Sequence, residues 1–170
     1  MKKALMIASV LLIAVVSTAC INNMAVQELN NKAAEYMQKG DYESAMNRLQ
    51  ASLDLDATMY ETYYNLGVAA INAEKFDKAI EALEGGIKVK PDFADFYYSL
   101  GIAQNNYAEK LGETEEDKEI SEEDKAKIDE LKKESVQNLI TYLEMKPNPE
   151  EKSTIDEIIK ANTEKIEEEE

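Results

Sequence analysis

Apolar side chains recur at intervals of three or four residues along most of the chain, the spacing of helices that bury one face. The pattern is clearest over residues 60–93, a window of 34 residues. A large ring, Leu, a small residue, Ala, a second large apolar residue and Pro occupy Tyr63, Leu66, Gly67, Ala79, Leu83 and Pro91. This order predicts two packed helices joined by a turn.

The same pattern occurs one period earlier, over residues 26–59. Its apolar and small positions are Leu29, Ala33, Tyr36, Ala45, Leu49, Ser52 and Leu53. Gly40-Asp41-Tyr42 supplies the turn between the two predicted helices. Two hairpins in phase therefore precede residue 94.

A third copy over residues 94–149 begins with Tyr97, Leu100 and Gly101 and then leaves the period. Its second half reappears at residues 136–147, where VQNLITYLEMKP parallels IEALEGGIKVKP of residues 80–91. The separation from Gly101 to Pro147 exceeds that from Gly67 to Pro91 by 22 residues. We therefore expect an acidic insertion at about residues 108–131.

The insertion is predicted to be largely helical, because Ala103, Tyr107 and Leu111 continue one helical stripe. Ser121-Glu122-Glu123-Asp124 is typical of a capping box that opens the returning helix. The inward positions of that helix are Ile128, Leu131, Leu139, Tyr142 and Leu143. The third hairpin should thus be longer than the others, with a short acidic loop over residues 112–120.

Residues 150–170 predict a final amphipathic helix and an acidic tail, Glu167 to Glu170. Its apolar positions are Ile155, Ile158, Ile159 and Ile166. Stacked repeats leave an apolar face at their end, and a helix with a polar outer side covers such a face.

The period and its residues resemble the tetratricopeptide repeat. The resemblance implies an all-α protein, a right-handed α-solenoid of about three helical hairpins with a C-terminal capping helix. It also implies a scaffold that binds proteins or peptides, with no enzymatic activity and no cofactor. Because roughly 145 residues form one contiguous stack, we expect a single domain.

In this family the first helix of each pair lines a concave groove, which a partner enters at repeat positions two, five, nine and twelve. One subclass binds acidic chaperone tails through Lys, Arg and Asn side chains, and here only Asn65 matches, while Asp95 stands where a cation is needed. Candidate groove residues are Asn30, Ala34, Met37, Tyr64, Asn65, Val68, Ile71, Tyr98, Ile102 and Asn105.

Two interpretations of these groove positions remain open. Val68, Ile71 and Ile102 either contact a partner or pack against the capping helix and neighbouring repeats. Tyr64 and Tyr98 are the candidate rigid aromatic contacts for a bound peptide.

The first 19 residues predict a secretory signal, with two lysines, a short apolar run and small residues before Cys20. The run is too short to span a bilayer. Ala19-Cys20 resembles the lipobox of bacterial lipoproteins, with Ser17 where Leu is usual. The resemblance implies lipidation at Cys20, a tether over residues 20–25, and the periplasmic face of the outer membrane, since Ile21 is not the Asp of inner-membrane retention. An ordinary signal with an unmodified cysteine is the alternative.

Charge narrows the classes of partner. The formal net charge is −16, which disfavours nucleic acid and weakly favours basic partners. The chain has no His and one Cys, and the acidic insertion lacks calcium-loop spacing, so we expect neither a metal site nor catalysis.

The leading hypothesis is a lipid-anchored adapter that holds another envelope protein or peptide at the bacterial membrane. The alternative is a small-ligand or transport accessory lipoprotein that works beside a solute-binding protein.

Overall fold

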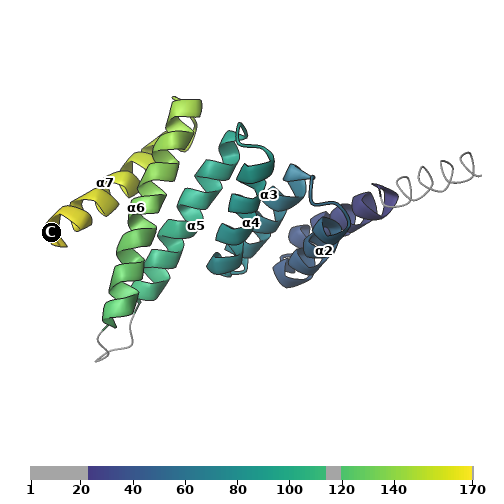
Figure 1. Ribbon diagram of the computed structural model, residues 1–170, viewed down its shortest axis with the longest axis horizontal. Coiled ribbons are helices and arrows are strands. Elements are labelled where there is room, and N and C mark those ends of the chain that lie inside the picture. The colour runs from purple at the N-terminus through teal and green to yellow at the C-terminus, as the bar shows by residue number, and fades with distance from the viewer. Residues whose placement is uncertain (1–22, 114–119, 170) are drawn as a thin grey trace, which may run out of the picture.

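The computed structural model describes residues 23–113 and 120–169, with side chains as far as residue 164. The described residues are helical with short connections and contain no strand. Successive helices stand side by side in one row, as Figure 1 shows, so the predicted all-α solenoid is confirmed. The helices span residues 23–38, α2 (Tyr42–Leu55), α3 (Tyr60–Asn72), α4 (Phe76–Val89), α5 (Ala94–Gly112), α6 (Glu122–Met145) and α7 (Lys152–Glu169).

Each hairpin closes where a large apolar side chain of its second helix lies over a small residue of its first. A Cβ atom on Gly67 would lie 2.5 Å from Cγ of Leu83. A Cβ on Gly101 would lie 2.7 Å from Cγ of Leu139. Leu139 therefore occupies in the third hairpin the place that Leu83 occupies in the second, although the insertion separates it further from its glycine.

The turns of the first two hairpins have one geometry. Gly40 and Glu74, one period apart, have φ angles of 74° and 54°. In both turns the following amide donates to a carbonyl five residues earlier, Asp41 to Tyr36 at 2.9 Å and Lys75 to Ala70 at 2.9 Å. This left-handed residue with its long hydrogen bond ends the first helix of each pair.

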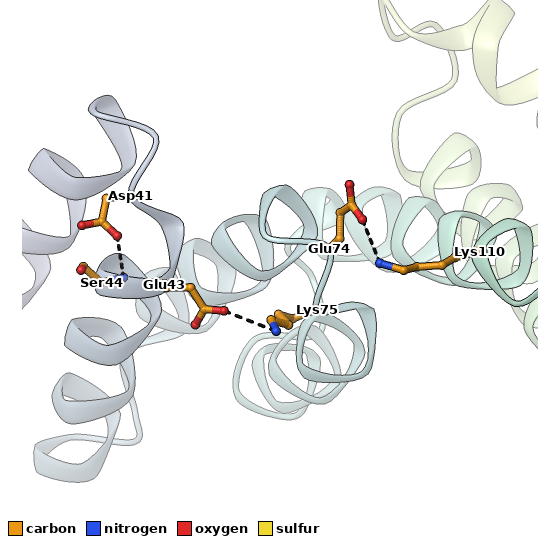
Figure 2. Close-up of polar contacts among 6 residues, drawn as sticks. All are labelled: Asp41, Glu43, Ser44, Glu74, Lys75 and Lys110. Atoms are coloured by element: carbon orange, nitrogen blue, oxygen red, sulfur yellow. Dashed lines mark hydrogen bonds and ion pairs between the residues drawn. The ribbon is translucent and has the colours of Figure 1, made fainter. Parts of the chain in front are cut away.

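Exposed ion pairs link successive turns, as Figure 2 shows. Lys75 lies 3.5 Å from Glu43 at the start of α2, and Glu74 lies 2.8 Å from Lys110 on α5. Asp41 caps α2 by accepting the Ser44 amide at 3.1 Å. Because all these groups are exposed, the apolar contacts between helices contribute more to stability than these pairs do.

The third hairpin lacks that turn. Ala108 stands at the position equivalent to Gly40 and Glu74, yet it lies within α5, which continues to Gly112. Ala108, Ile128 and Leu131 form a small buried cluster that joins the extended ends of α5 and α6. The prediction that the insertion is helical here is therefore confirmed.

The predicted cap at the start of α6 is also confirmed. The Ser121 hydroxyl oxygen accepts the Asp124 amide at 3.0 Å. The inward positions expected for this helix are buried or half-buried: Ile128, Leu131, Leu139, Tyr142 and Leu143. Most of the expected acidic loop, residues 114–119, lies outside the described residues.

Helix α7 covers the end of the stack. Ile155 is fully buried against Leu139 and Tyr142, and Ile158 and Ile159 pack beside it. The side chain of Ile166 lies outside the described part of the chain, as does Glu170.

The expected signal and Cys20 lie outside the described residues, so nothing in the structure bears on lipidation. Residues 23–25, expected to belong to the tether, are already helical, and Val26, which follows them in the same helix, is buried. Within the described part of the chain, no helix combines the length and apolarity needed to cross a bilayer.

Candidate functional site

Tyr64 on α3 and Tyr98 on α5 open onto one cleft of about 360 Å³. The end of α6 and the connection to α7 close its far side. The other residues around it are Asp95, Tyr142, Lys146, Pro149, Glu150 and Glu151. We call this set the Tyr64–Tyr98 cleft.

Neighbouring rings hold Tyr64 in place. Its ring meets Phe93 edge to face at 5.4 Å between centroids and Phe96 at 6.0 Å. Phe96 is itself fully buried and lies over Gly86, where a Cβ would come within 2.2 Å of the ring. The absence of a side chain at Gly86 therefore creates the space for Phe96, which in turn positions Tyr64 at the cleft.

Tyr98 is supported from the opposite side. Its ring lies 5.1 Å from that of Tyr142, between centroids. The Lys146 ammonium lies 5.5 Å from the centroid of the Tyr142 ring and pairs with the Asp95 carboxylate. Both tyrosines are thus half-buried with their rings braced, and a ligand meets surfaces that need little ordering.

Carboxylates dominate the electrostatics of the Tyr64–Tyr98 cleft. Three of them, Asp95, Glu150 and Glu151, line it together with a single ammonium, that of Lys146. Burial raises the pKa of Tyr98, and the carboxylate of Glu151 raises it further. The Tyr98 phenol therefore stays protonated and can donate a hydrogen bond, while the rim attracts positive charge.

Burial and the same Glu151 carboxylate also raise the pKa of Tyr142. The hydrogen bond to Asp95 raises the pKa of Lys146, so this ammonium stays charged and engaged. Within the described chain, no three His, Cys, Asp or Glu side chains lie close enough to hold a metal ion. The arrangement offers aromatic rings and charged groups that can contact a ligand.

The other candidate groove residues are spread along the stack. Asn30 bridges two helices: its amide donates to the Ser52 hydroxyl at 2.8 Å, and its carbonyl accepts from Thr62 at 3.1 Å. Asn105 is 7% exposed and accepts the Asn162 amide of α7 at 3.0 Å. Both side chains therefore serve contacts within the protein.

The apolar candidates divide between the core and the surface. Met37 and Ile71 pack on the main core cluster, and Ile102 packs on the cluster that includes Ile155 of α7. Val68 and Asn65 are half-buried, and Ala34 is exposed. Packing against the capping helix, one of the two interpretations left open, therefore describes Ile102.

Sequence reasoning missed the α6 end of the Tyr64–Tyr98 cleft: Tyr142, Lys146, Glu150 and Glu151. One signal was present, because Lys146-Pro147 repeats Lys90-Pro91. The Lys90 ammonium lies 5.1 Å from the centroid of the Tyr60 ring, so both lysines of this repeat position lie over tyrosines. The two glutamates follow the last repeat and have no equivalent in the earlier copies.

Comparison with known proteins identifies the repeats. Residues 36–101 match the tetratricopeptide repeat family. No curated protein matches the chain in sequence.

Solved structures share the fold. The tetratricopeptide-repeat domain of Arabidopsis OM64 has a TM-score of 0.64 at 14% identity, over 83% of this chain and 96% of that one. The first such domain of RPAP3 (Spaghetti), bound to the HSP90 peptide SRMEEVD, has a TM-score of 0.63 at 19% identity, over 81% and 93%.

A bacterial structure is similar to the same degree. The Yersinia enterocolitica type III secretion chaperone SycD, in complex with a peptide of the translocator YopD, has a TM-score of 0.62 at 19% identity, over 82% of this chain and 92% of that one. At these identities the likeness concerns the fold alone. Residues 36–101 therefore match the tetratricopeptide repeat, and the chain shares the fold of tetratricopeptide-repeat domains.

Proposed function

We propose that the protein is a non-enzymatic scaffold that binds a basic segment of another protein at the Tyr64–Tyr98 cleft. The observation that carries the proposal is the pairing of two braced, half-buried tyrosines with an acidic rim. A Lys or Arg side chain of a peptide can place its cation near Glu150 and Glu151 and its stem along the rings. Peptide amides and carbonyls can bond to the phenol hydroxyls.

Two of the structural relatives support a peptide as the ligand class, since both are complexes with peptides. The RPAP3 domain is bound to SRMEEVD, which ends in three acidic residues among its last four. In this chain Asp95 and Glu151 would repel such a peptide. The negative charge of the cleft therefore favours a basic peptide over an acidic one.

We further propose that Cys20 carries lipid and anchors this scaffold in a bacterial envelope, at the periplasmic face of the outer membrane. The support is the sequence of the first 20 residues. Several acyl chains hold a protein at a bilayer without a spanning helix, at about 0.8 kcal/mol for each buried methylene. The adapter would then raise the local concentration of its partner at the membrane.

Affinity capture from detergent-solubilised envelopes tests the scaffold function. Wild-type protein is compared with Tyr64→Ala/Tyr98→Ala and with the control Tyr42→Ala, which removes a ring from α2 outside the cleft. We expect a partner that the double variant loses and the control retains. A partner lost only when a short linker replaces residues 112–120 would contradict the assignment to the cleft. Absence of any partner would favour the small-ligand alternative.

The anchor is tested separately by feeding cells an alkyne-tagged fatty acid and comparing wild type with Cys20→Ala. We expect the label and membrane retention in the wild type only. Label in neither protein would contradict lipidation and leave the binding proposal standing.

A further inference from the structure

The insertion builds a second cleft, of about 960 Å³, that the standard repeat does not have. It lies between the extended half of α5, the first half of α6 and residues 154–162 of α7. Figure 1 shows α7 and α6 diverging from their shared connection, so their far ends are apart. We call it the insertion cleft and define it by Asn105, Ala108, Glu109, Ile128, Ile158 and Asn162.

Two buried amides form the base of the insertion cleft. Asn162 is 5% exposed and its amide donates to the Asn105 carbonyl oxygen at 3.0 Å. The Asn105 amide donates to the Glu109 carboxylate at 3.1 Å. These two hydrogen bonds orient both amide groups.

These hydrogen bonds leave one hydrogen-bond acceptor at the base of the insertion cleft. The Asn162 carbonyl oxygen has no donor within the described chain. No fully buried side-chain oxygen or nitrogen of the described residues lacks a partner, so this oxygen is open to the cleft. A second acceptor is the remaining oxygen of the Glu109 carboxylate. The base is therefore suited to a ligand that brings N–H donors.

The walls add an apolar surface and a net negative charge. Ala108 and Ile128 are buried in the cluster beneath the cleft, and Ile158 is half-buried beside it. Asp129 and Glu157 contribute further carboxylates to the lining. The two lysines that line it are outnumbered by the four carboxylates.

We propose that the insertion cleft is a second binding site, which takes an amphipathic segment of a partner protein through a Lys or Arg side chain. The aliphatic stem packs on Ile128 and Ile158, and the cationic head reaches the Asn162 oxygen and Glu109. An Arg head suits the base best, because it carries several N–H donors in one plane. This site is distinct from the Tyr64–Tyr98 cleft and does not depend on it.

The test uses the full chain in neutral detergent micelles and a fluorescein-labelled peptide of Leu and Arg at helical spacing. Its twin carries Glu in place of Arg. We expect saturable binding of the Arg peptide only. Glu109→Lys/Glu157→Lys should weaken it about tenfold. Glu35→Lys/Glu84→Lys, which makes the same charge change at exposed positions outside the cleft, should weaken it by less than about twofold.

A second pair of variants separates the two clefts. Tyr64→Ala/Tyr98→Ala removes the rings of the other cleft, and this variant should still bind the Arg peptide saturably. Adding Ala161→Trp, which places a large ring at the insertion cleft lining, should abolish that remaining binding and leave the circular dichroism unchanged. Failure of the wild type to bind, equal losses in both charge pairs, or loss of all binding in the tyrosine variant alone would each overturn the proposal.

Discussion

Leu139 lies over Gly101 as Leu83 lies over Gly67, with the absent Cβ atoms 2.7 and 2.5 Å from the two leucine Cγ atoms. The carbonyl of Ser135 is 3.2 Å from the same point over Gly101. The Ser135 hydroxyl also donates to the Gly101 carbonyl at 2.7 Å. Helices α5 and α6 are therefore in backbone contact at this residue, and the long insertion leaves the crossing of the ordinary repeat intact.

Gly101→Ala should destabilise the protein by about 1–3 kcal/mol, because the new methyl group displaces Leu139 and part of the backbone of α6. Gly112→Ala is the matched control, since a Cβ there meets nothing closer than Ile128 at 4.0 Å. Urea unfolding followed by circular dichroism measures both. Equal stability of the two variants would contradict the close crossing.

Glu74→Gly should raise the unfolding free energy by up to about 1 kcal/mol. Glycine adopts the φ of 54° without the strain that glutamate has there. The exposed pair with Lys110 is lost, but such pairs contribute little. Gly40→Ala, at the equivalent turn, should destabilise by about 1 kcal/mol. Thermal unfolding compares them, and a Glu74→Gly variant less stable than wild type would show that the ion pair dominates.

Asn30→Ala should cost about 1–3 kcal/mol, because it leaves the fully buried hydroxyls of Ser52 and Thr62 without their shared partner. Replacing all three, as Asn30→Leu/Ser52→Ala/Thr62→Val, should recover most of that loss. The equivalent contact of the next repeat, Gly86 with Phe96, is apolar and shows that this geometry needs no hydrogen bond. If the triple variant instead lost as much unfolding free energy as the three single variants together, this explanation would be contradicted.

Glu134 predicts a pH dependence opposite to that of most carboxylates. Burial raises its pKa above the ordinary 4.5, and Glu130 raises it further. The folded protein then binds the proton more readily than the unfolded chain, so its stability falls as the pH rises from about 4.5 through the raised pKa.

Glu134→Gln should therefore have a higher urea midpoint than wild type at about pH 7 and an equal one at about pH 4. Glutamine keeps an oxygen for the Gln104 amide, which donates to Glu134 at 2.8 Å. Glu144→Gln, exposed further along α6, is the control for the loss of a carboxylate from this helix. A constant difference between wild type and Glu134→Gln at both pH values would contradict the assigned shift.

The sequence predicted the repeats well because each depends on local periodicity and on small residues at fixed positions. Gly67 and Leu83 recur one period after Ala33 and Leu49, and that recurrence is visible in one dimension. The split third repeat could be found for the same reason: its closing Lys146-Pro147 survives.

The candidate site was harder, because its residues come together only through helix packing. Helical position alone cannot show that α7 covers Asn105 or that Asn30 bonds to Thr62 from the next helix pair. The acidic rim at Glu150 and Glu151 lies in a connection without repeat equivalents, so no periodic argument reaches it. Tyr64 and Tyr98 could be predicted as candidates because they stand at equivalent positions of two repeats.

The most direct test of the central claim is the affinity of the wild type for the binding segment of its captured partner, measured by calorimetry beside Glu150→Lys/Glu151→Lys. We expect a segment rich in Lys or Arg, about tenfold weaker binding by the variant, and an affinity of the variant that depends less on salt than that of the wild type. An unchanged or higher affinity of the variant would show that the acidic rim of the Tyr64–Tyr98 cleft does not select the partner, and would contradict the proposed function.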